Sequence, residues 1–410
     1  MNTITDTKRD TVAYCYVYTI LWQLYQLQGI LGIENIAKVL LIFLLAYSLY
    51  KVIEVNLRYK LPLFIKGVNV LLLMFTIYGI LYLLIGEVYI IHAAYGVGSV
   101  AKSDYLKNIF RSIPMIYVYY DFARKGVFRN GKNIMPLLII CMIPSILMFF
   151  GYYATILKNN VAKFAYVDGF TNNIGYQFVP LMALSLLMKK WRFPILCICM
   201  AFIVVSLKRG AIIIGTFSFL AYFYMLYKNS SGSRRTAVVC FFTISIIVSG
   251  YFAYDFYKNS EGVQHRLEQT LAGYSSGRDV LYADLLEYYP KQESSLAMIF
   301  GNGADASIKV AGNYAHNDWL ELLINQGLLG VTVFIIFYIL WFRNLRQISR
   351  HAPENVTVAF GILLLGSFIS SFYSMAYTSF SSSNCIVIGI ALTYSMVAKE
   401  RENKGYITAV

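Results

Sequence analysis

The run GVNVLLLMFTIYGILYLLIG at residues 67–86 contains no charged side chain. An α-helix of about 20 apolar residues spans the roughly 30 Å hydrocarbon core of a bilayer, and similar runs recur along the chain. Hydrophobic residues make up 58% of the sequence and charged residues only 14%. A soluble protein needs more charge than this to cover its surface. The composition therefore predicts a single all-α, polytopic membrane domain over residues 1–410.

Twelve membrane-spanning helices are expected from the apolar runs. They cover residues 12–31, 36–54, 67–86, 103–121, 134–157, 171–188, 192–207, 210–227, 236–253, 316–342, 356–373 and 380–397. The first run is long enough to stay in the membrane, which argues against a cleaved signal peptide.

The orientation of these spans follows from the positions of the basic residues. Lysine and arginine cluster in alternate connections, of which residues 122–133 are one, whereas the short connections between them contain few. Because basic loops stay in the cytoplasm, both termini are predicted to be cytoplasmic. The longest polar segment, residues 254–315 between the ninth and tenth spans, is then extracytoplasmic.

Charge and cysteine content exclude several classes of protein. The net charge of +14 is better explained by membrane topology than by nucleic-acid binding, because the basic residues lie in short loops. All the cysteines fall in predicted spans, so neither a disulfide framework nor a metal site is expected. These residues are Cys15, Cys141, Cys197, Cys199, Cys240 and Cys385.

The large loop contains one predicted helix and one tight turn. Leu281, Leu285 and Tyr288 recur at helical spacing from Arg278 onward, and Pro290 ends the pattern. The GNG turn at residues 301–303 lacks the lysine and the serine or threonine of a phosphate-binding P-loop. No nucleotide or other cofactor is therefore expected on this side of the membrane.

The connection between the seventh and eighth spans is a candidate anion site. It reads KRGA at residues 208–211, with two cations on a predicted outer turn. The free N–H groups at a helix N-terminus favour phosphate, and the planar guanidinium of Arg209 matches phosphate oxygens. Alternatively, Lys208 and Arg209 extend toward lipid headgroups as an ordinary interfacial pair.

Arg278 and His316 are the candidate catalytic residues of the large loop. Arg278 either binds an anion or forms a salt bridge with Asp279 or Asp284. His316 opens the tenth span, and Asp318 and Glu321 resemble a capping box. The helix dipole then disfavours imidazolium, and a neutral imidazole facing water can act as a general base. The alternative is an ordinary interfacial histidine.

Four further residues have weaker assignments. Lys107 and Arg111 lie four residues apart on one face of the fourth span, where they either bind an anionic head group or sit at the outer interface. Gly327 and Gly330 are interpreted as helix-packing residues.

Taken together, these motifs resemble the O-antigen ligase and polymerase superfamily, bacterial enzymes that join lipid-linked glycans on the outer face of the inner membrane. The resemblance covers roughly residues 205–342. It depends on KRGA at 208–211, GRD at 277–279, GNG at 301–303, HNDWLEL at 316–322 and QGLLG at 326–330. The first two hundred residues agree with it only in the number of spans. Lys208 departs from the family, whose turns often have a small polar residue there.

The resemblance implies a metal-independent glycosyltransferase that needs no cofactor. Its substrates would be undecaprenyl-diphosphate-linked glycans, and Arg209, Arg278 and His316 would be its important residues. Lys208, Lys107 and Arg111 are additional candidates for diphosphate binding.

A polymerase that extends O-antigen or capsular polysaccharide is favoured over a ligase that transfers glycan to lipid A-core. A chain-length regulator and a flippase are the expected protein partners, besides the lipid bilayer. A twelve-span secondary transporter is the alternative from a different class, although such carriers usually have their longest loop inside.

Overall fold

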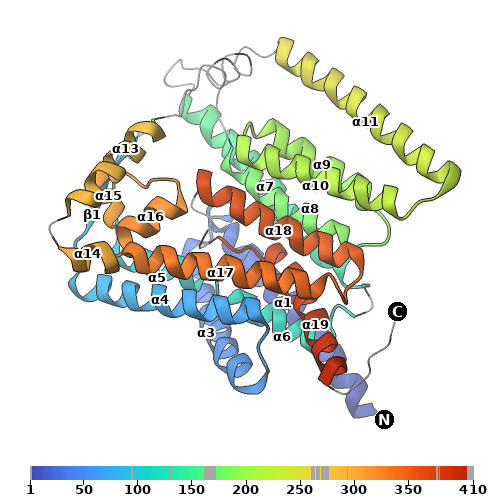
Figure 1. Cartoon of the computed structure of the whole chain (residues 1–410), viewed down its shortest axis with the longest axis horizontal. Helices are drawn as coiled ribbons and strands as arrows, with labels where there is room; N and C mark the ends of the chain where they lie inside the picture. The colour runs from blue at the N-terminus through green and yellow to red at the C-terminus, as the bar shows by residue number, and fades with distance from the viewer. Residues whose placement is uncertain are drawn as a thin grey trace.

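The computed structural model is built almost entirely of helices (Figure 1). It describes residues 2–93, 96–129, 131–160, 172–259, 264, 268, 277–292, 294–374, 377 and 379–403. The first half contains α1 (Asn2–Gln26), α2 (Gln28–Leu31), α3 (Glu34–Arg58), α4 (Leu63–Ile85), β1 (Tyr89–Ala93), β2 (Gly96–Val100), α5 (Lys102–Phe110), α6 (Met115–Arg124), α7 (Ile134–Asn160), η2 (Asn173–Gln177), α8 (Phe178–Leu186) and α9 (Arg192–Val205).

The second half continues with longer helices on either side of several short ones. It contains α10 (Arg209–Lys228), α11 (Gly232–Asn259), α13 (Arg278–Tyr288), η3 (Tyr289–Lys291), α14 (Ser295–Phe300), α15 (Ala306–Ala311), α16 (Asp318–Asn325), α17 (Gly327–Ile348), α18 (Glu354–Tyr373) and α19 (Ser382–Asn403).

Within the described residues, 6 helices are long and apolar enough to cross a membrane. They are α3, α4, the Ile134–Tyr152 part of α7, α10, α17 and α18, and two shorter apolar helices are α9 and the Ser382–Met396 part of α19. The expectation of a helical membrane protein is confirmed in this form. The count of twelve spans stays a prediction.

Four of the expected single spans are each divided between two elements, and the first of them, the run at 12–31, is shared by α1 and α2. The run at 103–121 forms α5 and α6, which separate just before Pro114, a residue that cannot donate a backbone hydrogen bond. The run at 171–188 forms η2 and α8, and its first residue lies outside the described part. The run at 316–342 forms α16 and α17, which meet at Gly327 with a φ of 65°.

The break between α16 and α17 is where the GNG turn docks. The backbone N–H groups of Asn302 and Gly303 donate to the carbonyl oxygens of Ile324 and Asn325, each at 3.0 Å. A Cβ on Gly301 would lie 2.3 Å from the Asn325 oxygen, and one on Gly327 would lie 2.5 Å from the Gly301 nitrogen. Both glycines therefore allow the turn to approach the helix break.

Two helix pairs form the closest packing of the bundle. α4 packs along α17, where the rings of Phe64 and Trp341 lie 4.9 Å apart. α6 packs along α19, where a Cβ on Gly389 would lie 2.6 Å from the carbonyl oxygen of Tyr119. Small residues allow such approach between membrane helices, where both surroundings are apolar.

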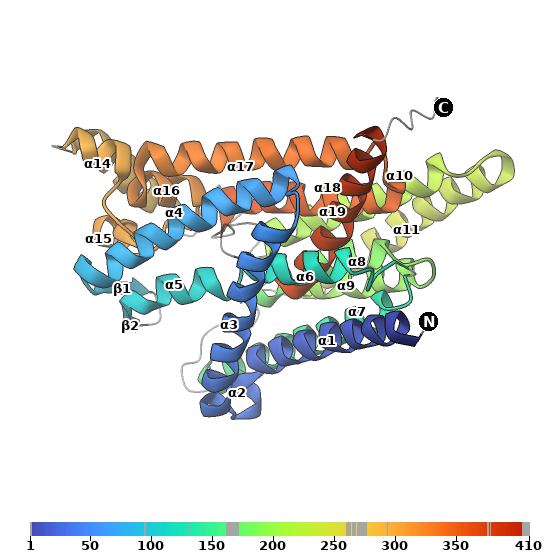
Figure 2. The ribbon, with the colours of Figure 1, turned by 90° about the horizontal axis from the view of Figure 1, so that it is seen from below.

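The polar elements gather at one end of the bundle. α13, α14, α15, α16 and β1 lie together there, whereas the first residues of α1 and the last residues of α19 lie at the opposite end (Figures 1 and 2). The hairpin of β1 and β2, which pairs Tyr89 with Val100, was not expected from the sequence. The expected loop 254–315 begins inside α11, and most of residues 260–276 lie outside the described part.

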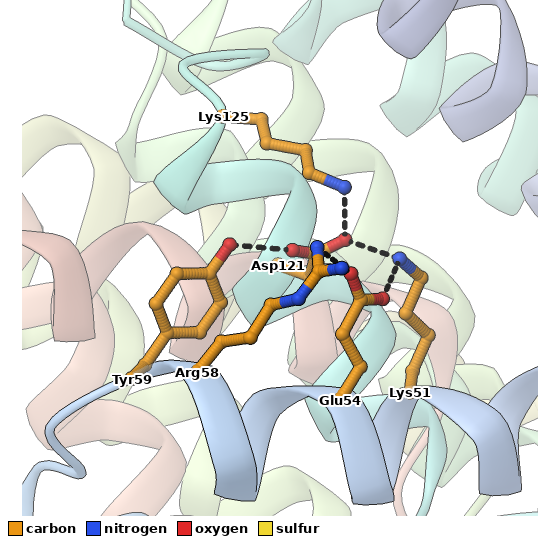
Figure 3. Close-up of polar contacts among 6 residues, drawn as sticks. All are labelled: Lys51, Glu54, Arg58, Tyr59, Asp121 and Lys125. Carbon is orange, nitrogen blue, oxygen red and sulfur yellow. Dashed lines mark hydrogen bonds and ion pairs between the residues drawn. The ribbon is translucent and has the colours of Figure 1, made fainter.

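A buried ion cluster ties α3 to α6 (Figure 3). Its members are Lys51, Glu54, Arg58, Tyr59, Asp121 and Lys125. The Asp121 side chain has an exposed fraction of 0%, and it accepts from Lys51 Nζ at 2.7 Å and from Lys125 Nζ at 2.8 Å. Lys51 also lies 2.5 Å from the Glu54 carboxylate. Each buried charge has an opposite partner, which is what allows such groups inside a protein.

Candidate active site

The turn before α10 packs against η2. Ser206 accepts a backbone hydrogen bond from Asn172 at 2.9 Å, and Asn172 in turn caps η2 through its side chain. A Cβ on Gly175 would lie 2.2 Å from Ser206 Oγ, and one on Gly210 would lie 2.3 Å from the Tyr176 hydroxyl. The glycines thus bring the start of α10 against Tyr176.

Arg278 is held at the end of α18. It is the first residue of α13, and Gly277 before it has a φ of 79°. Its Nη1 donates to the carbonyl oxygen of Tyr373 at 3.0 Å, and the Tyr282 hydroxyl donates to that of Phe372 at 3.5 Å. The last carbonyls of a helix have no partner within the helix and carry partial negative charge, so a guanidinium is stabilised there.

His316 lies in a strained turn just before α16. Its φ of 53° is uncommon for a residue with a side chain. The Glu321 carboxylate holds this turn against α15, because it accepts from the backbone N–H of Ala315 in the turn and from Ser307 Oγ in α15. Glu321 itself is fully buried.

The cap of α16 differs from the sequence expectation. Asn317 is the capping residue, and its Oδ1 accepts from the backbone N–H groups of Trp319 at 3.0 Å and Leu320 at 3.2 Å. The expected capping box of Asp318 and Glu321 is therefore wrong. Glu321 reaches back past the cap and holds the turn that carries His316.

A cavity of about 1030 Å³ collects residues from both polar segments. Lys208, Arg278, His316 and Arg111 line it, together with Tyr176. The sequence predicted that Arg278 and His316 would meet in one pocket, and it offered Lys208 and Arg111 as additional candidates for binding the diphosphate. Arg111 lies in the break between α5 and α6. Its side chain reaches the cavity from this interruption of the expected fourth span.

Two predicted site residues are not among those that line this cavity. Arg209 is the first residue of α10 and its side chain is exposed. The convergence expected for Arg209, Arg278 and His316 is thus observed for the last two and for Lys208. Lys107 forms an ion pair with Asp104 at 2.6 Å on the surface of α5. Lys107 is four residues from Arg111 in the sequence, but its charge is paired with Asp104 on its own helix.

The pKa of His316 is lowered from its usual value. Burial is the largest cause, and the positive charges of Arg278 and Lys208 add to it. The side chain is therefore neutral near pH 7, as expected from the sequence. The expected cause was the dipole of the helix that follows, whereas burial and two cations lower the pKa here.

Polar groups continue into the interior of the cavity. Gln23 from α1, Ser145 from α7, Gln177 from η2 and Ser382 from α19 all line it. The Gln23 amide donates to Ser382 Oγ at 3.3 Å. These residues come from four segments far apart in the sequence, so only the fold brings them to one cavity. The cavity can hold water or a hydroxyl-rich ligand well below its cationic part.

The fold and cavity define a helical membrane protein with a basic, water-accessible site between its helices. No known protein-family model matches this chain, and no curated protein sequence matches it either.

Proposed function

We propose that the chain is a polymerase that joins undecaprenyl-diphosphate-linked oligosaccharide repeat units into O-antigen or capsular polysaccharide. The main support is the arrangement of three cations and one neutral imidazole around a single cavity. In this proposal the protein has about twelve spans in a bacterial inner membrane, with both termini cytoplasmic. The polar end formed by α13–α16 faces the periplasm or the cell exterior.

The cations suit the leaving group of this reaction. Lys208 and Arg278 approach the cavity from α10 and α13, and Arg111 approaches from the end of α5. A diphosphate carries negative charge that increases as its bond to the sugar breaks. Positive groups already in place stabilise that charge without reorganisation, which is a large contribution to many enzymatic rates.

His316 is assigned the role of general base. Its neutral imidazole accepts the proton of the acceptor hydroxyl while that oxygen forms a bond to the anomeric carbon of the donor. The bond between the anomeric carbon and the diphosphate oxygen breaks, and the lipid diphosphate leaves with the electron pair. The proton then passes from His316 to solvent or to the leaving group. The donor bond supplies the driving force.

A ligase would use the same donor and the same cavity. It differs in the acceptor, which would be lipid A-core instead of a second lipid-linked chain. A deletion strain distinguishes the activities on a glycan gel. Loss of the polymerase leaves a single repeat unit on the core, whereas loss of the ligase leaves bare core with accumulated lipid-linked polymer. Unchanged glycan together with a lost solute uptake would favour the secondary transporter instead.

Complementation of that strain tests the site. We expect Arg278→Ala and His316→Ala to abolish long glycan at an unchanged level of protein in the membrane. Lys291→Ala is the matched control, because Lys291 is an exposed cation of the same loop that pairs with Glu287. Normal glycan in both site variants would overturn the proposed function.

A further inference from the structure

A second, smaller cavity of about 250 Å³ lies beside the basic one. Its lining includes Tyr105, Asn108, Arg111, Asp305, Tyr314 and Tyr377. Arg111 and Ser379 line both cavities, so the two cavities are neighbours.

The side chain of Asp305 is the unusual feature of the second cavity. Asp305 precedes α15, where an aspartate normally accepts a hydrogen bond from the helix, yet it makes no such cap. Its exposed fraction is 4%, and burial and the charge of Asp104, with no hydrogen bond, account for the shift of its pKa. A buried carboxylate without a partner is costly, so its position on a cavity wall indicates an external partner.

Burial also raises the pKa of Asp305 to about 7, with a smaller contribution from Asp104. Both protonation states are therefore accessible near neutral pH, and either can hydrogen-bond to a hydroxyl group.

One short segment separates the two cavities. Asn313 and His316 line the basic cavity, whereas Tyr314 lines the second one. The candidate general base is therefore carried on the wall that the cavities share. A ligand that fills the second cavity would lie close to the group that accepts the acceptor proton.

The lining of the second cavity fits a sugar ring better than a phosphate. Tyr105 and Tyr377 are buried aromatic residues, and aromatic faces pack against the apolar face of a sugar. A carboxylate, an amide and a guanidinium can bind adjacent hydroxyl groups. The carboxylate of Asp305 would repel a diphosphate, which the basic cavity already suits.

We propose that the second cavity binds one sugar ring of the acceptor glycan, with Asp305 and Asn108 hydrogen-bonded to its hydroxyl groups. The assignment of this sugar to the acceptor glycan rests on the proposed function. The binding of a sugar ring at Asp305 can be tested separately.

The test uses the oligosaccharide repeat unit released by mild acid from the strain's own lipid-linked glycan and freed of phosphate. Its binding to the full-length protein in detergent is measured by titration calorimetry. We expect Asp305→Ala and Asn108→Ala each to weaken binding by about tenfold, as the loss of a hydrogen bond to a charged or polar group does. Asp284→Ala, the same substitution at an exposed carboxylate of the large loop, is expected to bind as the wild type does.

Kinetics with the lipid-linked substrates then identify the sugar. An increased KM for the acceptor, with an unchanged KM for the donor, supports the proposal. Unchanged oligosaccharide binding in both variants overturns it, and so does an increase confined to the donor KM. If the oligosaccharide binds through Asp305 but the wild-type protein transfers no glycan, the sugar site stands and the proposed function fails.

Discussion

Arg278 donates to the carbonyl oxygen of Tyr373 at 3.0 Å, so the first residue of α13 is tied to the last residue of α18. A guanidinium has five N–H donors, and this contact occupies one nitrogen. Within the described residues this is the one hydrogen bond of the Arg278 side chain, and Arg278 also lines the cavity. One side chain can therefore hold the two helices together and bind an anion.

Arg278→Lys should reduce kcat/KM for the proposed glycan transfer by about 10²-fold, because a lysine is a point charge without the planar fork of donors that a guanidinium presents to a diphosphate. Initial rates with purified protein measure this. A conservative exchange at the surface, Lys291→Arg, should leave the rate unchanged. Equal rates for Arg278→Lys and the wild type would show that a point charge is sufficient.

Lys208→Ala and Arg209→Ala compare the residue that the structure places at the cavity with the residue that the motif resemblance favours. Lys208 lines the cavity and Arg209 is exposed. We expect Lys208→Ala to lower the transfer rate more than Arg209→Ala does, because only a cation near the leaving group stabilises its charge. Paired rate measurements decide the order. The reverse order would indicate that Arg209 turns toward the substrate when it binds.

The rate should depend on pH through His316. Its lowered pKa keeps the imidazole neutral, so the rate should hold down to a pH below the usual histidine value and fall at more acidic pH. Lys208→Gln removes a positive charge, raises this pKa and should shift the acidic limb of kcat/KM to higher pH. In the unfolded chain His316 has the usual, higher histidine pKa and binds the proton more readily. The contribution of His316 therefore makes the folded state less stable as the pH falls below that usual pKa. An acidic limb that does not move would argue against His316 as the base.

Glu321→Ala should disturb the turn that carries His316. The substitution leaves the N–H of Ala315 and the hydroxyl of Ser307 without their acceptor, at a cost of about 1–3 kcal/mol for each buried group. We expect a lower melting temperature and a lower kcat. Glu321→Gln keeps an oxygen for Ala315 and should restore most of kcat, which distinguishes positioning of His316 from loss of the fold.

Asp121→Ala should destabilise the protein without changing the chemistry. Removal of one partner from a buried ion pair costs about 3–5 kcal/mol, because Lys51 and Lys125 lose a buried counter-charge (Figure 3). Arg58→Ala, at a side chain with an exposed fraction of 64%, should cost less than about 1 kcal/mol. Thermal unfolding in detergent compares the two. A change in KM for either substrate in folded Asp121→Ala would link the ion cluster to the site.

The helices that local pattern determines were predictable from the sequence. The helix expected from Arg278 to Tyr289 is α13, which ends at Tyr288, and the span expected at 210–227 is α10. Hydrophobic periodicity and Pro290 were sufficient for the first, and an uninterrupted apolar run was sufficient for the second.

The break between α16 and α17 and the second cavity were not predictable, whereas Pro114 is a local signal for the break between α5 and α6. An apolar run gives no sign that its helix stops at Gly327, because the break depends on a turn from a distant segment. Asp305 follows the GNG turn as an ordinary polar residue. Only the fold buries it in the wall of the cavity that Arg111 also lines, so no local pattern distinguishes it from the exposed Asp284.

At the α16–α17 junction a Cβ on Gly301 would meet the backbone of Asn325 and Gln326, and one on Gly327 would meet the backbone of Gly301 and Ile299, so both positions require glycine. A change at one cannot be relieved by a change at the other, since both are already the smallest residue. Chimeras of this protein with a similar membrane protein should therefore exchange residues 295–330 as one block. Hybrids joined between the two glycines would combine backbones that were never selected to fit.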